Sequence, residues 1–331
     1  MNTKRIYLDH AATSWPKSPD VLEAMDRCAA ELGAAGRGAY ASAAKADSHI
    51  QILRRRLSQL IDAESPSEIS LHCNGTMALN AAIHGLIRPG DHVVTTAADH
   101  NSVLRPLHFL SKRSGVELTV VPCDQYGFVS ADAVLSHVQP NTRLVAMTHA
   151  SNVTGCVLPV EEVGVTLSDR ETMFLVDAAQ TLGYVPVSLK NIRADLLAAP
   201  GHKGTGGPLG TGLLYVASAI QNDIIPVIQG GTGSASESLS MPDRFPDKLE
   251  AGNLNVPALA GWSVALGDLD QSSVGLALVK LSGMMHEMLA NISSVRLFSK
   301  PGPLAVASLQ MDGLSPMELA VILDTEFGVE A

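Results

Sequence analysis

A lysine stands inside a glycine-rich segment of the chain, Gly201–Gly212. Glycine lets the backbone approach a ligand closely, and Lys203 is the only Lys or Arg in the segment. A lysine in this setting can form a Schiff base with a carbonyl compound. A plain phosphate-binding loop is the alternative, although the Walker spacing is absent. The segment predicts a ligand site around Lys203.

A carboxylate ends one of the most apolar stretches of the chain. Asp177 follows Met173–Val176 and opens the segment Asp177–Gln180. A carboxylate at the end of such a strand is partly desolvated and requires a cationic partner. A structural helix cap is the alternative interpretation of Asp177.

Three further polar segments follow expected strands, where an open α/β sheet binds its ligands. In Asn74–Thr76, backbone N–H groups and a hydroxyl can meet an anion, although on local evidence a strand-to-helix turn capped by the threonine is the favoured interpretation. In Ala98–Ser102, His100 can stack on a flat ligand or move protons, or it lies in a helix-capping turn. In Ser151–Gly155, Asn152 can donate to a ligand oxygen, but turns also favour Asn and Gly.

Alternating strand and helix patterns position these segments. Such alternation predicts a mostly parallel sheet covered by helices on both faces. The expected strands are Glu68–Cys73, His92–Thr96, Val116–Val121, Thr142–His149, Thr172–Asp177, Asp195–Ala199 and Thr211–Val216, and the expected helices are Thr76–Leu86, Ser102–Ser114, Ala131–Val138 and Val160–Ser168.

The pattern changes after residue 230. Gly230–Pro257 is expected to be an ordered functional loop or a linker. A long helix over Val274–Asn291 and two strands, Val295–Phe298 and Leu304–Gln310, follow it. The last helix has a capping box at Ser315–Glu318 and a stop at Gly328, and a new strand is expected from Val329.

Length and charge exclude several classes of protein. The 331 residues suit a large α/β domain with a smaller one, and the net charge of −10 argues against a nucleic-acid partner. We expect the triplet Arg54–Arg56 to lie on a solvated helix face.

No apolar run is long enough to span a membrane and no signal peptide begins the chain, so we expect a soluble, unexported protein. The four cysteines are spaced for neither a disulfide framework nor a zinc site, which fits the cytoplasm.

Seven segments, taken together and in order, resemble the class V aminotransferase superfamily, which uses pyridoxal phosphate (PLP) on the fold-type I scaffold. The resemblance covers nearly the whole chain and is strongest to the cysteine desulfurase and selenocysteine lyase branch, whose dimer-contacting loop is similar to Gly230–Ser234. The segments are Tyr7–Thr13, Asn74–Asn80, Asp99–Ser102, Ser151–Gly155, Asp177–Gln180, Gly201–Gly212 and Glu250–Gly252.

The resemblance implies a role for each candidate residue. Lys203 would hold PLP as a Schiff base and transfer protons, and Asp177 would pair with the pyridine nitrogen. His100 would stack on the ring, and Gln180 and Asn152 would lie near its phenolic oxygen and the substrate. The phosphate would be held by Gly75, Thr76 and His202, with a contribution from the second subunit of a homodimer.

Three features depart from the family pattern. Pro200 stands where relatives have Ser or Thr, and Asn253 replaces a Thr. The family's nucleophilic cysteine and a carboxylate-binding arginine lie on the segment that would follow Val329, and the sequence stops before both. Cys73 or Cys156 could substitute if close to the cofactor, although we interpret each as a buried small hydrophobe.

The sequence therefore predicts an α/β, fold-type I PLP-dependent transferase. Its large PLP-binding domain, with a mainly parallel sheet, covers residues 15–260, and a small α+β domain, C-terminally incomplete, covers 1–14 and 261–331. We expect a desulfurase-like enzyme that converts L-cysteine, or selenocysteine, to alanine in the cytoplasm, with a sulfur-acceptor protein as a possible partner. Two alternatives stay open: another PLP reaction (transamination, β-elimination or racemisation), and a non-catalytic homologue or fragment.

Overall fold

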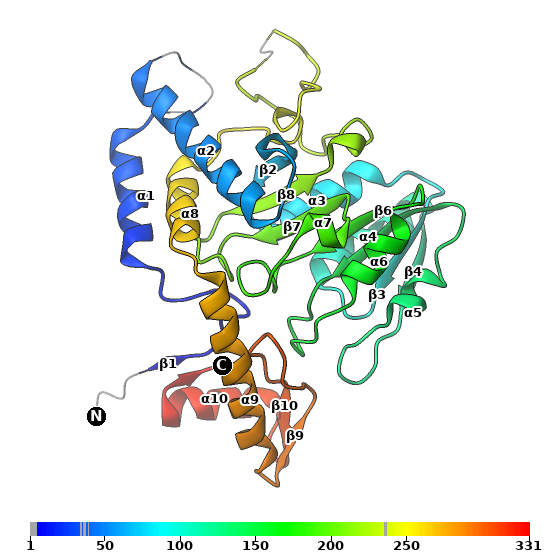
Figure 1. Ribbon diagram of the computed structural model, residues 1–331, viewed down its shortest axis with the longest axis vertical. Coiled ribbons are helices and arrows are strands. Elements are labelled where there is room, and N and C mark those ends of the chain that lie inside the picture. The colour runs from blue at the N-terminus through cyan, green and yellow to red at the C-terminus, as the bar shows by residue number, and fades with distance from the viewer. Residues whose placement is uncertain (1–4, 34, 36–37, 39, 235–236) are drawn as a thin grey trace.

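A seven-stranded sheet forms the centre of the molecule (Figure 1). The computed structural model describes residues 5–331 apart from 34, 36–37, 39 and 235–236. The strands lie in the order β2-β8-β7-β6-β5-β3-β4; β3 to β7 run parallel and β8 runs antiparallel to both of its neighbours. They are β2 (Ile69–His72), β3 (His92–Thr96), β4 (Glu117–Val121), β5 (Thr142–Thr148), β6 (Met173–Asp177), β7 (Leu196–Pro200) and β8 (Gly212–Val216). The predicted, mostly parallel sheet is confirmed.

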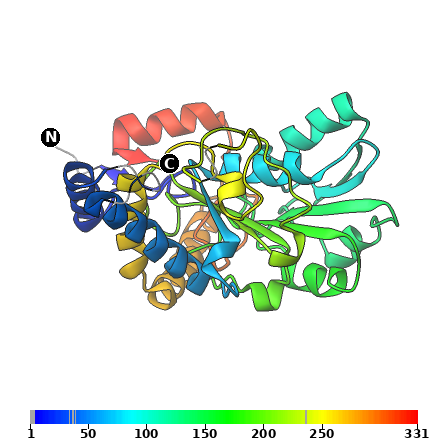
Figure 2. The same cartoon turned by 90° about the horizontal axis from the view of Figure 1, so that it is seen from above.

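Helices cover both faces of this sheet, as predicted (Figure 2). Helices α3 (Gly75–Leu86) and α4 (Asn101–Ser114) pack on one face. The other face is covered by α5 (Ala131–Leu135), α6 (Val160–Leu167) and α7 (Leu189–Ile192). Because both faces are buried, β6 contains only apolar residues before its terminal aspartate.

Three helices form a layer beside the sheet: α1 (Pro19–Glu31), α2 (Ala41–Leu60) and α8 (Val256–Gly267). The expectation for the arginine triplet on α2 was wrong for Arg54, which is buried, and for Arg56, which is half-buried and donates to the backbone oxygen of Ser263 on α8. The guanidinium of Arg54 donates to the backbone oxygen of Ile69 and forms an ion pair with Glu250. Arg55 is exposed, as expected for a solvated face.

The lower lobe in Figure 1 joins the two ends of the described chain. Strand β1 (Ile6–Tyr7) pairs in parallel with β11 (Val329–Glu330), beside α9 (Gln271–Ala290) and α10 (Pro316–Phe327). Strands β9 (Val295–Leu297) and β10 (Leu309–Met311) form an antiparallel pair. The capping box of α10 and its stop at Gly328 are confirmed. The strand predicted over 304–310 was too long, because only β10 pairs there.

The predicted division into two domains stays a prediction. The boundary at 260 falls within α8, and residues 1–4 of the small domain lie outside the described residues. Residues 235–236 of the predicted loop 230–257 also lie outside the described residues. The described part of this loop is irregular except for a short 3-10 helix, Asp247–Leu249, and the start of α8. Two more 3-10 helices are Pro66–Glu68 and Ser218–Ile220.

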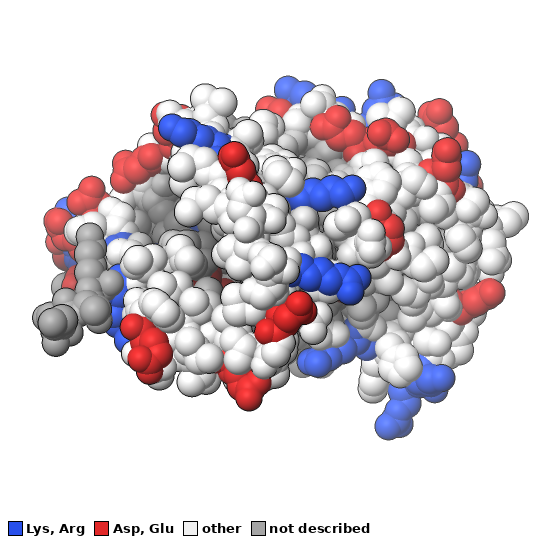
Figure 3. All heavy atoms as spheres, turned by 90° about the horizontal axis from the view of Figure 1, so that it is seen from below, with Lys and Arg blue, Asp and Glu red and all other residues white. Residues whose placement is uncertain are grey.

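The surface of the lower lobe mixes charged, polar and apolar side chains. Figure 3 shows acidic and basic side chains scattered around a broad area of other residues. Apolar side chains on α9 and α10 contribute to the exposed surface, among them Leu276, Met288 and Met317. In the part of the chain that the structure describes, no helix is long and apolar enough to cross a membrane.

Candidate active site

Asp177 and Lys203 face the same site from adjacent parts of the sheet. Asp177 ends β6 and is buried, and Lys203 is half-buried in the loop between β7 and β8. Burial raises the pKa of Asp177, and attraction to Lys203 and His100 opposes this rise. Burial also lowers the pKa of Lys203, against attraction to Asp177 and Asp9. The fold therefore brings together an acid, an amine and an imidazole that the sequence singled out.

The loop that carries Lys203 is held by a buried tryptophan. Trp262 on α8 donates from Nε1 to Thr205 Oγ1 over 2.9 Å, and Thr205 donates to the backbone oxygen of Gly201 over 2.8 Å. A Cβ at Gly207 would lie 2.4 Å from Trp262 Cδ1, and one at Gly201 would lie 2.2 Å from Thr211 Oγ1. The glycines are therefore required by close packing within the loop itself.

The N-terminal segment closes on the residue before the lysine. The backbone oxygen of His202 accepts hydrogen bonds from Ser14 N at 2.9 Å and from Lys17 Nζ at 2.9 Å. The Thr13 hydroxyl also donates to this oxygen, over 3.1 Å. Burial lowers the pKa of Lys17 to about 8. Sequence reasoning missed Lys17, which no motif marks.

The imidazole of His202 is left with a free buried nitrogen. Its Nδ1 is inaccessible to solvent and has no hydrogen-bond partner among the described residues. Burial, together with repulsion from Lys203 and Lys17, lowers the pKa of His202 to about 4. The ring is therefore neutral at physiological pH and can offer Nδ1 to a ligand.

A chain of hydroxyl groups joins the predicted phosphate segment to His100. Thr76 Oγ1 lies 2.7 Å from Ser102 Oγ, which lies 2.9 Å from His100 Nδ1. His100 caps α4 by accepting from Ser102 N, yet its side chain is exposed. The cap of α3 is Asn74 rather than the expected threonine, since Asn74 Oδ1 accepts from Met77 N over 2.8 Å. Thr76 is therefore not needed as a cap.

A buried carboxylate braces the turn before His100. Asp99 Oδ2 accepts from the hydroxyls of Thr95 and Thr96 at 2.9 and 2.7 Å. Its Oδ1 accepts from Thr148 N on β5 at 2.5 Å. Burial outweighs these bonds and raises the pKa of Asp99 to about 6. Sequence reasoning gave Asp99 no role, although two threonines before an aspartate were a usable signal.

Gln180 and Asn152 differ in their surroundings. Gln180 is buried and donates from Nε2 to the backbone oxygen of Ala11 over 3.0 Å. Asn152 is exposed, and within the described residues its side chain makes no hydrogen bond. His149, at the base of the Asn152 turn, is buried with an unpartnered Nδ1.

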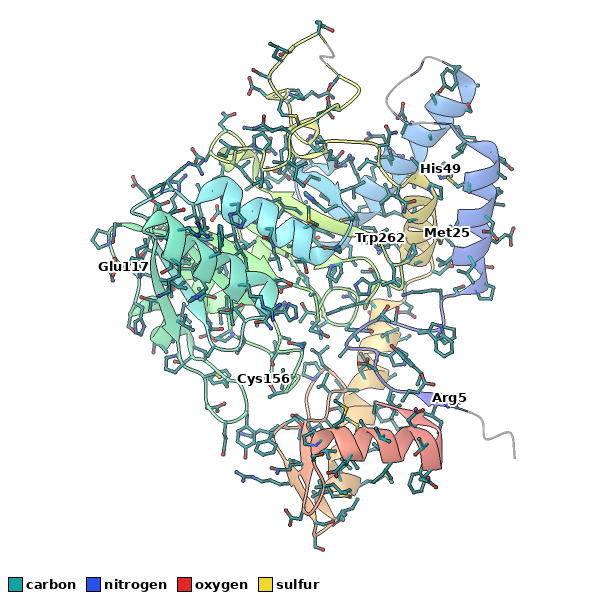
Figure 4. The ribbon with its side chains drawn as sticks, turned by 180° about the vertical axis from the view of Figure 1, so that it is seen from behind. Arg5, Met25, His49, Glu117, Cys156 and Trp262 are labelled. Carbon is teal, nitrogen blue, oxygen red and sulfur yellow. The ribbon has the colours of Figure 1, made fainter. Side chains whose placement is uncertain are left out.

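The four cysteines differ in exposure: Cys28 is buried, Cys123 and Cys156 are half-buried, and Cys73 is exposed. Cys73 is exposed beside Asn74, so the expectation that it is a buried hydrophobe was wrong. Cys156 is half-buried and faces the lower lobe (Figure 4), where burial raises the pKa of its thiol. A raised pKa leaves less thiolate at neutral pH and makes Cys156 the poorer nucleophile.

The site and fold belong to a known class of enzyme. The chain is a member of the aminotransferase class-V family, whose family model matches residues 6–331, and this family is PLP-dependent. This confirms the family predicted from the seven segments.

Several proteins similar to this chain are cysteine desulfurases by name. The chain is 34% identical over 334 residues to a probable cysteine desulfurase of Methanothermobacter thermautotrophicus, covering 98% of this chain and 82% of that protein. It is 30% identical over 306 residues to cysteine desulfurase IscS of Methanosarcina thermophila, covering 90% and 71%. An apo cysteine desulfurase of Thermococcus onnurineus NA1 superposes with a TM-score of 0.88 at 28% identity, covering 98% and 83%.

The residues present fit PLP. A buried carboxylate suits a protonated pyridine nitrogen, and Asp177 Oδ1 accepts a hydrogen bond of ordinary length, 3.0 Å, from Ala179 N. The free Nδ1 of His202 can bind a phosphate oxygen. Lys203, which directly follows His202 and is attracted to Asp177, supplies the amine.

Proposed function

We propose that this chain is a PLP-dependent enzyme that converts L-cysteine to L-alanine and passes the sulfur to a thiolate. The observation that carries the proposal is that buried Asp177, at the end of β6, and half-buried Lys203, in the loop after β7, lie close enough to attract each other, because a PLP enzyme needs both groups in one site. The names of the similar proteins support the choice of cysteine as substrate.

Asp177 and Lys203 divide the proton chemistry. PLP, when bound, withdraws electrons from the substrate Cα. Asp177 keeps a proton on the pyridine nitrogen by its negative charge. Lys203 holds the cofactor and then moves a proton at the substrate carbon, which its lowered pKa favours because more of the amine is neutral.

The remaining candidate residues bind and orient. Gly75, Thr76 and His202 hold the phosphate, with Thr76 fixed by its bond to Ser102. The exposed ring of His100 stacks on the cofactor ring. Buried Gln180 reaches the phenolic oxygen, and exposed Asn152 meets the substrate.

The sulfur step requires a thiolate acceptor. The acceptor sulfur bonds to the substrate sulfur, the Cβ–S bond breaks, and its electron pair stays on Cβ, which is then protonated to give alanine. The acceptor is a thiol of a sulfur-acceptor protein, a small thiol in solution or a cysteine of this chain. Exposed Cys73 is the candidate within the chain, and Cys156 is the less reactive alternative.

Alanine release from L-cysteine, with PLP and excess dithiothreitol, tests the proposal. We expect Lys203→Ala to lower the rate by at least about 100-fold. Cys73→Ser and Cys156→Ser form a matched pair that shows whether a thiol of the chain accepts sulfur. Alanine formation that is unchanged in Lys203→Ala would refute the proposal.

We also propose a homodimer in the cytoplasm. The loop after β8 exposes Ile228 and Leu239, which an interface would cover. All four cysteines are free thiols, as is usual in a reducing compartment. Light scattering of the wild type and of Leu239→Asp measures the subunit number, and a wild-type monomer would rule out the dimer.

A further inference from the structure

Helix α4 and strand β4 form an open groove that the proposed function does not use. Its volume is about 530 Å³. The strand contributes Leu118 and Val120, and the helix contributes Leu104 and Phe109, whose side chain is 54% exposed. These side chains give the groove an apolar floor at the margin of the sheet. Figure 4 shows Glu117, the first residue of β4, at the edge of the molecule.

The backbone of β4 offers an edge for another strand. β4 is the last strand of the sheet, paired only with β3. Glu117 N donates to Asp91 O and Val121 O accepts from Ala97 N, so alternate residues of β4 bond toward β3. The N–H and C=O groups of Leu118 and Val120 therefore point outward, and no other described residue bonds to them. A free edge of this kind is a template for strand addition.

Cationic side chains surround the groove. Arg105, Lys112 and Arg113 are exposed on its helix side, together with His108. Among the described residues no carboxylate forms an ion pair with these three cations. This local positive charge contrasts with the net charge of −10 of the whole chain.

The one carboxylate on β4 does not offset this charge. Side chains alternate along a strand, so Glu117 and Thr119 point to the face opposite Leu118 and Val120. The hydrogen bond between Thr119 Oγ1 and His92 Nε2, 2.9 Å, lies on that opposite face.

We propose that the groove binds an extended acidic segment of a partner protein, which adds to β4 as an eighth strand of the sheet. An apolar side chain of the segment covers Leu118 and Val120, and carboxylates on either side of it meet the cations. Arg105 and Arg113 lie about 12 Å apart along α4, and residues i and i+4 of a strand lie about 13 Å apart. The segment therefore has its acidic residues four positions apart, with the apolar residue midway.

Binding of a labelled peptide to the PLP-loaded chain tests this proposal without any turnover. The probe is fluoresceinated Ser-Asp-Thr-Val-Thr-Asp-Ser, followed by fluorescence anisotropy. We expect Arg105→Glu with Arg113→Glu to weaken binding at least tenfold. The matched control, Arg55→Glu with Lys280→Glu, makes the same change of net charge at exposed positions on α2 and α9 and is expected to bind like the wild type. Equal weakening in both double variants would overturn the proposal.

Two further probes separate strand addition from simple attraction of charge. Two N-methylated versions of the same peptide are used, one methylated at its odd-numbered residues and the other at its even-numbered residues. Each version lacks the backbone N–H donors along one edge of the peptide strand and keeps those along the other edge. One version should bind at least tenfold more weakly and the other should not. Unchanged binding of both methylated peptides would overturn strand addition. Tighter binding of a ten-nucleotide oligothymidylate than of the peptide would assign the groove to nucleic acid instead.

Discussion

Arg54 and Glu250 form a buried ion pair between helix α2 and the segment that precedes α8, with Nη2 2.6 Å from Oε2. The other carboxylate oxygen accepts from Leu71 N on edge strand β2, at 2.6 Å. Arg54 also donates to Ile69 O on the same strand. The pair therefore fixes the edge strand of the sheet to the helical layer beside it.

Breaking this pair should destabilise the protein strongly. Glu250→Gln leaves the charge of Arg54 buried without a counter-ion, and we expect a loss of about 3 kcal/mol in the free energy of unfolding. Urea denaturation measures the loss. Arg5→Ala is the control: it removes a pair with Asp324 and Glu330 that is exposed to solvent, and it should change the midpoint little. Equal effects of the two variants would contradict the structural role of burial.

Adding a methyl group at Gly207 should disturb the loop that carries Lys203. The new Cβ would lie 2.4 Å from Trp262 Cδ1, and we expect Gly207→Ala to lower stability by about 3 kcal/mol and to weaken PLP binding. Thermal unfolding and titration of PLP absorbance measure the two effects. Gly230→Ala is the matched control, because its Cβ would be 3.8 Å from Ala251 Cβ, an ordinary contact. Normal PLP affinity in Gly207→Ala would show that the loop tolerates a shift of Trp262.

Acid should destabilise the fold through His149. Burial lowers the pKa of His149 to about 4, below the value of about 6.5 in an unfolded chain. A lowered histidine pKa favours folding above pH 6.5, and this contribution is lost as the pH falls toward 4. The full difference is about 3 kcal/mol.

Replacement of His149 by glutamine should therefore make the free energy of unfolding depend less on pH between about 6.5 and 4. Urea unfolding at pH 7 and pH 4.5 measures the slope, with the exposed His137→Gln as the control for loss of a histidine. If the free energy of unfolding falls as much between pH 7 and pH 4.5 in His149→Gln as in the wild type, other groups are responsible for the acid sensitivity.

Contact between the Asn152 turn and the lower lobe should depend on Gly155. Its φ is +69°, and a Cβ there would lie 2.9 Å from Val306 Cβ. We expect Gly155→Ala to speed hydrogen exchange in residues 295–311. Gly115→Ala is the control, since Gly115 has a φ of +66° but no atom within 4 Å of the added Cβ. Equal exchange in both variants would mean that backbone strain, not the contact with Val306, is responsible.

The core of the fold could be predicted from the sequence because local pattern determines it. Strands buried on both faces are continuous apolar runs, and residues such as Asp177 that follow them lie at one edge of the sheet. Helix α1 was not predicted, and a helix was expected within α2 only at the arginine triplet, because the buried residues of both helices include alanine and either cysteine or arginine and serine besides the aliphatic ones. Nor did the sequence place Arg54, since a buried arginine requires a partner nearly two hundred positions away.

The candidate site was predicted in part for the same reason. Residues in strand-to-helix turns, such as His100, could be named from the local sequence. The hydrogen bond from Trp262 to Thr205 and the bond from Lys17 to the backbone of His202 could not, because they join segments with no common pattern. The roles assigned to the site residues stay predictions until the variants are measured.

The pairing of β1 with β11 has a consequence for the order of assembly during synthesis. Every strand of the central sheet lies between residues 69 and 216, so the ribosome releases the whole sheet well before it releases α10. The strand at Ile6 leaves the ribosome before the sheet does but acquires its neighbour, Val329, only after the sheet has been released. Until then β1 lacks this neighbour and has an unpaired edge, and the lower lobe closes after the central sheet has been synthesised.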